Sequence, residues 1–114
     1  LHNAYWTDKR PMAVVQRTID NSLCFGVYLG DEMVGFARCV TDYAVMYWLS
    51  DVIIDEAHKG KGLGKALVGA VTGHEILAPL RGVLSTRDAH GLYEQFGFKN
   101  REGFYMGKVP GETE

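Results

Sequence analysis

The stretch from His58 to Lys65 alternates lysine and glycine immediately before a helical pattern, and it carries the clearest chemical signal in the sequence. Glycine tolerates positive φ and lets a ligand approach the backbone closely. The first turn of a helix leaves N–H groups without partners, and its partial positive charge attracts anions, as do nearby lysines. We therefore predict a phosphate or pyrophosphate site here. Its contacts are expected from Lys59, Gly60, Lys61, Gly62, Leu63, Gly64 and Lys65.

The glycine spacing excludes two common phosphate-binding motifs. A nucleotide P-loop requires Gly-x-x-x-x-Gly-Lys-Ser/Thr, but counting from Gly60 places Lys65 at the sixth position and Leu67 at the eighth. The dinucleotide motif Gly-x-Gly-x-x-Gly also fails, because its last position falls on Lys65 or Leu67. Taken alone, the stretch also fits a flexible connection between a strand and a helix.

Two motifs in order resemble those of the GNAT acetyltransferases. Residues 59–64 are similar to the acetyl-CoA signature Gln/Arg-x-x-Gly-x-Gly/Ala, with Lys59 in the first position. Lysine keeps the positive charge of arginine but lacks the planar guanidinium that can donate two parallel hydrogen bonds. Residues 89–98 resemble the second signature, a short helix that carries Tyr93 and ends in Gly97-Phe98. The resemblance covers roughly residues 24–108. It implies that acetyl-CoA is the co-substrate and that the pyrophosphate lies on the glycine-rich turn.

The resemblance also implies a second group of cofactor contacts. In the GNAT fold two parallel strands splay apart, and the earlier strand exposes backbone groups that pair with the pantetheine arm. Those groups would belong to Val52, Ile53 and Ile54, whose side chains can be buried at the same time. Thr86 stands where many relatives carry a cofactor-binding Asn, and its hydroxyl can still donate a hydrogen bond.

Tyr93 is the expected general acid, since the family commonly uses a Tyr at this point of this helix to protonate the departing CoA thiolate. A phenol with an ordinary pKa of about 10 is protonated at pH 7 and can donate. The alternative is that Tyr93 is an aromatic residue packed on Phe96 or Phe98.

Asp51 is the expected general base, acting directly or through water. Period-two alternation puts it on the face of Ile53, near where an attacking amine would arrive. Aromatic residues such as Tyr43, Tyr47 and Trp48 would raise its pKa. Equally, Asp51 could satisfy backbone groups at a strand bulge. His58 and His90 are weaker candidates, and no His, Cys or Asp spacing indicates a metal site.

Length and composition favour a single domain over residues 1–114 that acts on a small molecule. The chain has 114 residues, 46% of them hydrophobic, and a net charge of −2. Such a charge offers no broad cationic field for nucleic acid or acidic membranes. Without an apolar run of membrane-spanning length or a leader pattern, we expect a cytoplasmic protein. Cys24 and Cys39 lie on strands that a turn would bring together, but reduced thiols are favoured in that compartment.

The positioning elements follow from turn chemistry and hydrophobic periodicity. Residues 24–29 and 33–41 form a predicted hairpin around Gly30-Asp31-Glu32, and residues 45–54 a third antiparallel strand. A short strand at residues 82–86 is expected to lie parallel to the third, because a helix connects them. A last strand is predicted at residues 104–109.

Three helices are expected around this sheet. The first begins at Pro11 and ends at Asn21-Ser22, with Val14, Val15, Ile19 and Leu23 at helical spacing. The second runs from Gly62 to about Leu77, and the third over residues 89–96, with Asp88 as its N-cap and Gly97 as its C-cap. Residues 1–10 are interpreted as the tail of a helix and a loop anchored by Tyr5 and Trp6, and residues 110–114 as a disordered tail.

The predicted fold is therefore mixed α/β (α+β): a GNAT-like acyl-CoA N-acyltransferase fold with a mostly antiparallel sheet, a central splayed parallel strand pair and flanking helices. The first strand and helix of such domains are largely missing, so the strand at residues 24–29 would be an open edge, which suggests either a homodimer or cover by the N-terminal or C-terminal segment. The resemblance implies an N-acetyltransferase that moves an acetyl group from acetyl-CoA to a small-molecule or peptide amine by direct attack in a ternary complex. The alternative is a catalytically inactive CoA-binding sensor or interaction domain.

Overall fold

A four-stranded sheet with helices on both faces forms the body of the protein, as seen in a computed structural model that describes residues 11–101, 103 and 105–111. The strands are β1 (Leu23–Leu29), β2 (Glu32–Thr41), β3 (Met46–Ile54) and β4 (Arg81–Val83), in the order β1-β2-β3-β4. β1, β2 and β3 pair antiparallel, whereas β4 is parallel to β3. The predicted mixed α/β fold with one parallel strand pair is confirmed.

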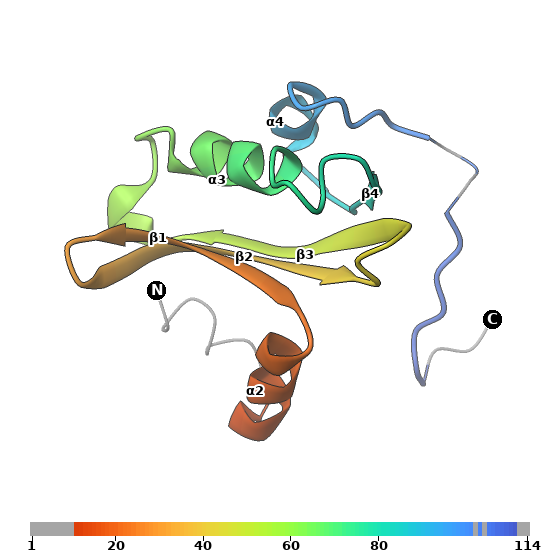
Figure 1. Cartoon of the computed structure of the whole chain (residues 1–114), viewed down its shortest axis with the longest axis horizontal. Helices are drawn as coiled ribbons and strands as arrows, with labels where there is room; N and C mark the ends of the chain where they lie inside the picture. Colours follow the sequence, from red (N-terminus) through yellow and green to blue (C-terminus); the bar gives the residue numbers. More distant parts are fainter. Residues whose placement is uncertain (1–10, 102, 104, 112–114) are drawn as a thin grey trace.

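The helices divide between the two faces of the sheet. α3 (Leu63–Thr72) and α4 (His90–Glu94) lie on one face, and α2 (Met12–Asp20) lies on the other (Figure 1). β3 is followed by the short 3-10 helix η1 (Glu56–His58), which leads into the glycine-rich stretch. Both ends of the glycine-rich stretch are thus attached to regular structure.

Turn residues explain the strand meander. Gly30 has φ 62° in the two-residue turn between β1 and β2, a conformation that glycine adopts without a steric penalty. Between β2 and β3, Asp42 Oδ1 accepts hydrogen bonds from the N–H groups of Ala44, Val45 and Met46. The predicted hairpin and third strand are both confirmed, within one residue at most ends.

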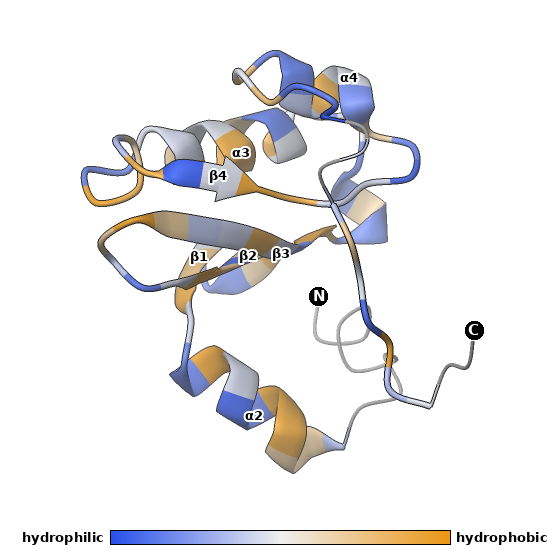
Figure 2. Cartoon of the chain, turned by 90° about the vertical axis from the view of Figure 1, so that its right-hand side faces the viewer, coloured by the Kyte–Doolittle hydropathy of each residue, from blue (hydrophilic) through white to orange (hydrophobic). Residues whose placement is uncertain are grey.

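Two apolar clusters hold the sheet between its helices. The larger one, on the α3 side, contains buried Cys39, Leu49, Leu67 and Val71. The smaller one packs Val15 of α2 against Phe36. Figure 2 shows α2 separated from the two-helix layer by the sheet, with hydrophobic and hydrophilic residues mixed along the helix. The two faces of β3 therefore lie in different environments, one toward α3 and the other toward α2.

The first helix matches its prediction, while the second is shorter than predicted. Pro11 is the N-cap of α2 and Asn21 its C-cap, but Leu23 belongs to β1 rather than to the helix. α3 ends at Thr72, with Gly73 as C-cap, instead of continuing to Leu77. Glycine destabilises a helix interior, and the chain then continues in turns that bury Leu77 completely.

Predictions for the C-terminal part need three corrections. β4 ends at Val83, so residues 84–86 are not strand. α4 spans His90–Glu94 instead of residues 89–96, with Ala89 and Gln95 as its caps in place of Asp88 and Gly97, and the Ala89 N–H donates to Thr86 Oγ1 at 3.1 Å. Residues 105–109 form no strand, because Gly103 turns the chain with φ 85° and Tyr105 packs its ring on Trp48, with centroids 5.9 Å apart.

Other sequence predictions concern the ends of the chain and the cysteines. Tyr5, Trp6, Phe104 and residues 112–114 lie outside the described residues. Cys24 and Cys39 are both free thiols, as the sequence favoured. They lie in different apolar clusters on opposite faces of the sheet. None of the described helices has the length and apolar character needed to cross a membrane.

Candidate functional site

A pocket of about 800 Å³ opens where β3 continues past its parallel partner. β4 pairs only with Met46, Tyr47 and Trp48, so the last residues of β3 have no β4 residue beside them. The pocket is bounded by the end of β3, η1, the glycine-rich stretch, the start of α3 and α4. Its wall on the β3 side is formed by Val52, Ile53 and Ile54, which is where a splayed parallel strand pair was predicted to expose backbone.

The glycine-rich stretch supplies donors at one end of the pocket. Gly60 and Gly62 have φ 83° and 78°, and Gly62 is the N-cap of α3 without a side-chain capping bond. The first bond of the helix runs from Ala66 N–H to the Gly62 carbonyl at 3.1 Å. Among the described residues, the N–H groups of Leu63, Gly64 and Lys65 therefore have no acceptor in the protein, and they carry the positive end of the helix dipole.

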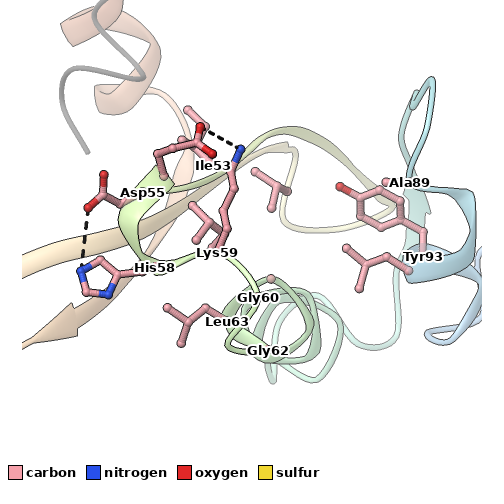
Figure 3. A pocket seen from close by; sticks show the side chains of 14 residues that line it. Ile53, Asp55, His58, Lys59, Gly60, Gly62, Leu63, Ala89 and Tyr93 are labelled. Atoms are coloured by element: carbon pink, nitrogen blue, oxygen red, sulfur yellow. Dashed lines mark hydrogen bonds and ion pairs between the residues drawn. The ribbon is translucent and has the colours of Figure 1, made fainter.

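Lys59 and Lys61 of this stretch each pair with a side chain of η1. Lys59 Nζ lies 3.4 Å from Glu56 Oε1, and Lys61 Nζ lies 3.2 Å from His58 Nδ1. His58 Nε2 lies 3.9 Å from Asp55 Oδ2. Figure 3 shows the Asp55–His58 pair and Lys59 at the β3 end of the pocket, away from Tyr93. Because the exposed pair of Lys59 is weak, this lysine can be redirected to an anion at small cost.

Tyr93 reaches the pocket from α4 on the opposite side. Its ring extends toward the pocket, beside Ala89 (Figure 3). The ring also packs edge to face on Phe98, with centroids 6.0 Å apart, so the predicted packing contact and exposure to the pocket coexist. Burial raises the pKa of the Tyr93 phenol above its ordinary value. A neutral phenol at the pocket wall is suited to donating a proton.

Thr86 has a local structural contact. Its Oγ1 accepts the N–H of Ala89 at 3.1 Å and thereby holds the start of α4, and it does not line the pocket. The hydroxyl hydrogen can still be donated, since a threonine oxygen accepts and donates at once.

Asp51 lies on the α2 face of β3, opposite the α3 face. It pairs across the sheet with Arg38, whose Nε donates to Asp51 Oδ2 at 2.8 Å. Tyr47 belongs to the cluster on the other face and Tyr43 is exposed in the turn, so neither supplies the aromatic surroundings expected for Asp51. The cause is a bulge at Ser50, which has no partner on β2 and shifts the alternation of β3 by one residue.

Most of the predicted cofactor contacts therefore meet around one pocket. The predicted residues that line it are Val52, Ile53, Ile54, Lys59, Gly60, Gly62, Leu63, Gly64 and Tyr93. The predicted residues that do not line it are Lys61, Lys65, Thr86 and Asp51. Among the lining residues absent from the predicted site are Asp55, Glu56, His58, Ala89 and Leu92. Ala89 lies one helical turn before Tyr93, and this i, i+4 spacing could have identified it. Within the described part of the chain, no cluster of three or more potential metal ligands occurs.

Comparisons with known proteins agree with this geometry. The family model described as "Acetyltransferase (GNAT) domain" matches residues 20–100. A GNAT-family protein from Xanthomonas campestris pv. campestris is 44% identical in sequence, with a TM-score of 0.83 over 93% of this chain and 78% of that one. An uncharacterised ycf52-like N-acetyltransferase of Prochlorococcus marinus is 37% identical over an alignment of 76 residues that covers 62% of this chain and 42% of that protein.

A third comparison concerns the fold alone. A GNAT family acetyltransferase from Elizabethkingia anophelis, whose structure contains acetyl-CoA, has a TM-score of 0.64 at 14% identity. The similarity covers 78% of this chain and 61% of that one.

Proposed function

The chain belongs to the GNAT acetyltransferase family, and we propose that it transfers the acetyl group of acetyl-CoA to a primary amine by direct attack in a ternary complex. The observation that carries the proposal is the pocket itself. It joins an exposed strand edge, a glycine-rich helix N-terminus and a neutral phenol within one space of about 800 Å³. The presence of acetyl-CoA in the related Elizabethkingia structure supports this choice of co-substrate.

Binding would use the two ends of the pocket differently. The pyrophosphate would lie at the start of α3, where the N–H groups of Leu63, Gly64 and Lys65 are free to donate to it. The pantetheine arm would lie along Val52, Ile53 and Ile54 and add its amides to the open edge of β3. This orientation directs the thioester toward the opening between β3 and β4.

The chemical step would be divided between the two faces of the sheet. The amine nitrogen attacks the thioester carbon, the C–S bond breaks, and the thiolate takes a proton from Tyr93, which lines the pocket on the α4 face. Asp51 lies on the α2 face next to Val52, where it would meet an amine that enters from that side and take the proton that the nitrogen loses, directly or through water; this proton balances the one that Tyr93 gives to the thiolate. Entry on one face and departure on the other would avoid a clash between nucleophile and leaving group. A small-molecule or peptide amine fits this proposal equally well.

The test is turnover with a panel of amines. The purified chain is incubated with acetyl-CoA and each amine, the released CoA is measured with a thiol reagent, and the acetylated product is identified by mass spectrometry. Reactions without amine correct for hydrolysis and for the protein's own thiols. We expect amine-dependent CoA release with at least one member of the panel. Saturable acetyl-CoA binding without any acetylated product would instead favour the inactive CoA-binding domain.

A further inference from the structure

Arg38 is the only charged side chain that is buried among the described residues, with 7% of its surface exposed. Its guanidinium donates to three side chains: Nε to Asp51 Oδ2 at 2.8 Å, Nη2 to Ser50 Oγ at 2.8 Å, and Nη1 to Ser22 Oγ at 3.1 Å. Lysine lacks the planar guanidinium group and cannot donate hydrogen bonds to these three side chains in the same geometry. Arg38 therefore ties β2 to two adjacent residues of β3 and to the residue that links α2 to β1.

Ser50 is the bulged residue of β3. Leu49 pairs with Cys39 and Asp51 with Arg38, and these are consecutive residues of β2, so Ser50 has no residue opposite it. A bulge bends its strand and increases the local twist. The bend lies between Trp48, the last residue that pairs with β4, and Val52, the first residue that lines the pocket.

The bulge also determines which way the pocket wall faces. Leu49 and Val52 both belong to the α3-side cluster although they are three residues apart, which strict alternation forbids. Without the extra residue, Val52 and Ile54 would face α2, and Ile53 would face α3. The face of the sheet on which each β3 residue of the pocket wall lies therefore depends on the bulge at Ser50.

We propose that Arg38 is a positioning residue for acetyl transfer: its bonds to Ser50 and Asp51 hold the bulge that presents the β3 edge to acetyl-CoA. The inference builds on the proposed function, since it assigns the edge at Val52–Ile54 to acetyl-CoA. Arg38 itself lies outside the pocket and acts through the backbone of β3. Aligning the reacting groups can change rates by about 10²-fold through shifts of about 1 Å, so a displaced edge would lower turnover strongly.

The experiment compares Arg38→Met, Arg38→Lys and Ser50→Ala with the wild-type chain. Arg17→Met is the matched control, because Arg17 is exposed on α2. Each variant is measured at a temperature well below its own unfolding midpoint. One readout is the KM for acetyl-CoA and kcat, and the other is amide hydrogen exchange of residues 50–54 in the ligand-free chain.

For folded Arg38→Met we expect at least a tenfold lower kcat/KM and at least tenfold faster exchange confined to residues 50–54. Ser50→Ala should lower kcat/KM and speed the exchange as well, but by less. Arg38→Lys should have a kcat/KM between those of Arg38→Met and the wild type, and Arg17→Met should match the wild type in both measurements. The inference would be overturned if folded Arg38→Met kept the wild-type kcat/KM and the wild-type exchange rate at residues 50–54. If Arg38→Met does not fold, the same result for Ser50→Ala would overturn it. The exchange measurement needs no cofactor, so it tests the role of Arg38 in holding the bulge even if the wild-type chain shows no acetyl-CoA turnover. Absence of turnover in the wild-type chain would refute only the proposed function.

Discussion

Tyr93 and Phe98 pack edge to face, with ring centroids 6.0 Å apart and ring planes at 75°. The chain between them turns at Gly97, which has φ 91°, and the N–H of Phe98 donates to the Tyr93 carbonyl at 3.3 Å. The end of α4 thus fixes the Tyr93 ring through contacts that do not involve its hydroxyl. Packing and proton donation can therefore be separated by mutation.

Replacing Tyr93 with Phe should lower kcat at least tenfold while leaving the fold and acetyl-CoA binding intact. The variant keeps the ring that contacts Phe98 and removes only the proton donor, and general-acid assistance is typically worth about 10²-fold to 10⁴-fold. Steady-state kinetics and a binding titration measure the two effects. Phe98→Leu is the control for packing: it should lower the melting temperature more than Tyr93→Phe does. Near-normal turnover in Tyr93→Phe would remove Tyr93 from the proposed mechanism.

The pH profile should identify the same group. Burial raises the pKa of Tyr93 above the ordinary value of a tyrosine. The acid form is the active one, so the rate should stay level up to about pH 10 and fall only above it, as the phenol ionises. This alkaline fall should be weaker or displaced in Tyr93→Phe. An identical alkaline limb in both proteins would assign the ionisation to another group.

Gly62→Val should abolish the thermal stabilisation that acetyl-CoA gives to the wild-type chain. A ligand that binds the folded state raises the melting temperature, and a branched side chain at the N-cap of α3 would block its approach to the free N–H groups. Gly30→Val is the matched control, since Gly30 also has positive φ, with open space around it, but lies in the distant β1–β2 turn. Both variants should lose similar stability without ligand, and only Gly62→Val should lose the acetyl-CoA shift. An equal shift in both would place the phosphate site elsewhere.

Gly82→Ala should destabilise the junction of β3 and β4. A Cβ on Gly82 would lie 2.6 Å from Cζ and Oη of buried Tyr47 and 3.1 Å from Phe98 Cε1. Overpacking of this kind typically costs about 1–3 kcal/mol. Gly91→Ala has open space in α4 and should be stabilising, by about 0.5–1 kcal/mol, because alanine favours a helix. Chemical denaturation of the two variants should give changes of opposite sign, and equal changes would argue against the tight contact at Tyr47.

The sequence predicted the parts of the site that depend on local turn chemistry. The glycine-rich stretch, the hairpin at Gly30 and the positive φ of Gly97 after α4 follow from the few conformations that such residues favour. One of the two interpretations of Asp51 placed it at a strand bulge, but neither identified Ser50 as the bulged residue or Arg38 as the partner of Asp51, because a bulge is a property of two strands. Its hydrophobic pattern would place Tyr47 and Asp51 on one face, and the unpaired Ser50 puts them on opposite faces. Similarly, the end of α3 depends on the tertiary burial of Leu77, which a helical pattern cannot reveal.

The buried thiol of Cys39 should make the protein less stable at alkaline pH. Burial raises the pKa of Cys39 from 9.0 to about 12. Between these values the unfolded chain loses the thiol proton and the folded chain keeps it, so the free energy of unfolding falls as the pH rises from about 9 toward 12. Below pH 9 the thiol is protonated in both states and contributes no pH dependence. The slope for one such group approaches about 1.4 kcal/mol per pH unit.

Urea denaturation between pH 8 and pH 10 tests this, because the tyrosines titrate mainly above that window. Cys39→Ala should be less stable than the wild type at pH 8, through lost packing, but its stability should fall less steeply toward pH 10. Cys24→Ala is the matched control: its thiol is only partly buried and its pKa is also raised, so its removal should flatten the slope less. If the Cys39→Ala and wild-type curves run parallel over these two pH units, the Cys39 thiol ionises equally in both states and its burial does not control the alkaline loss of stability.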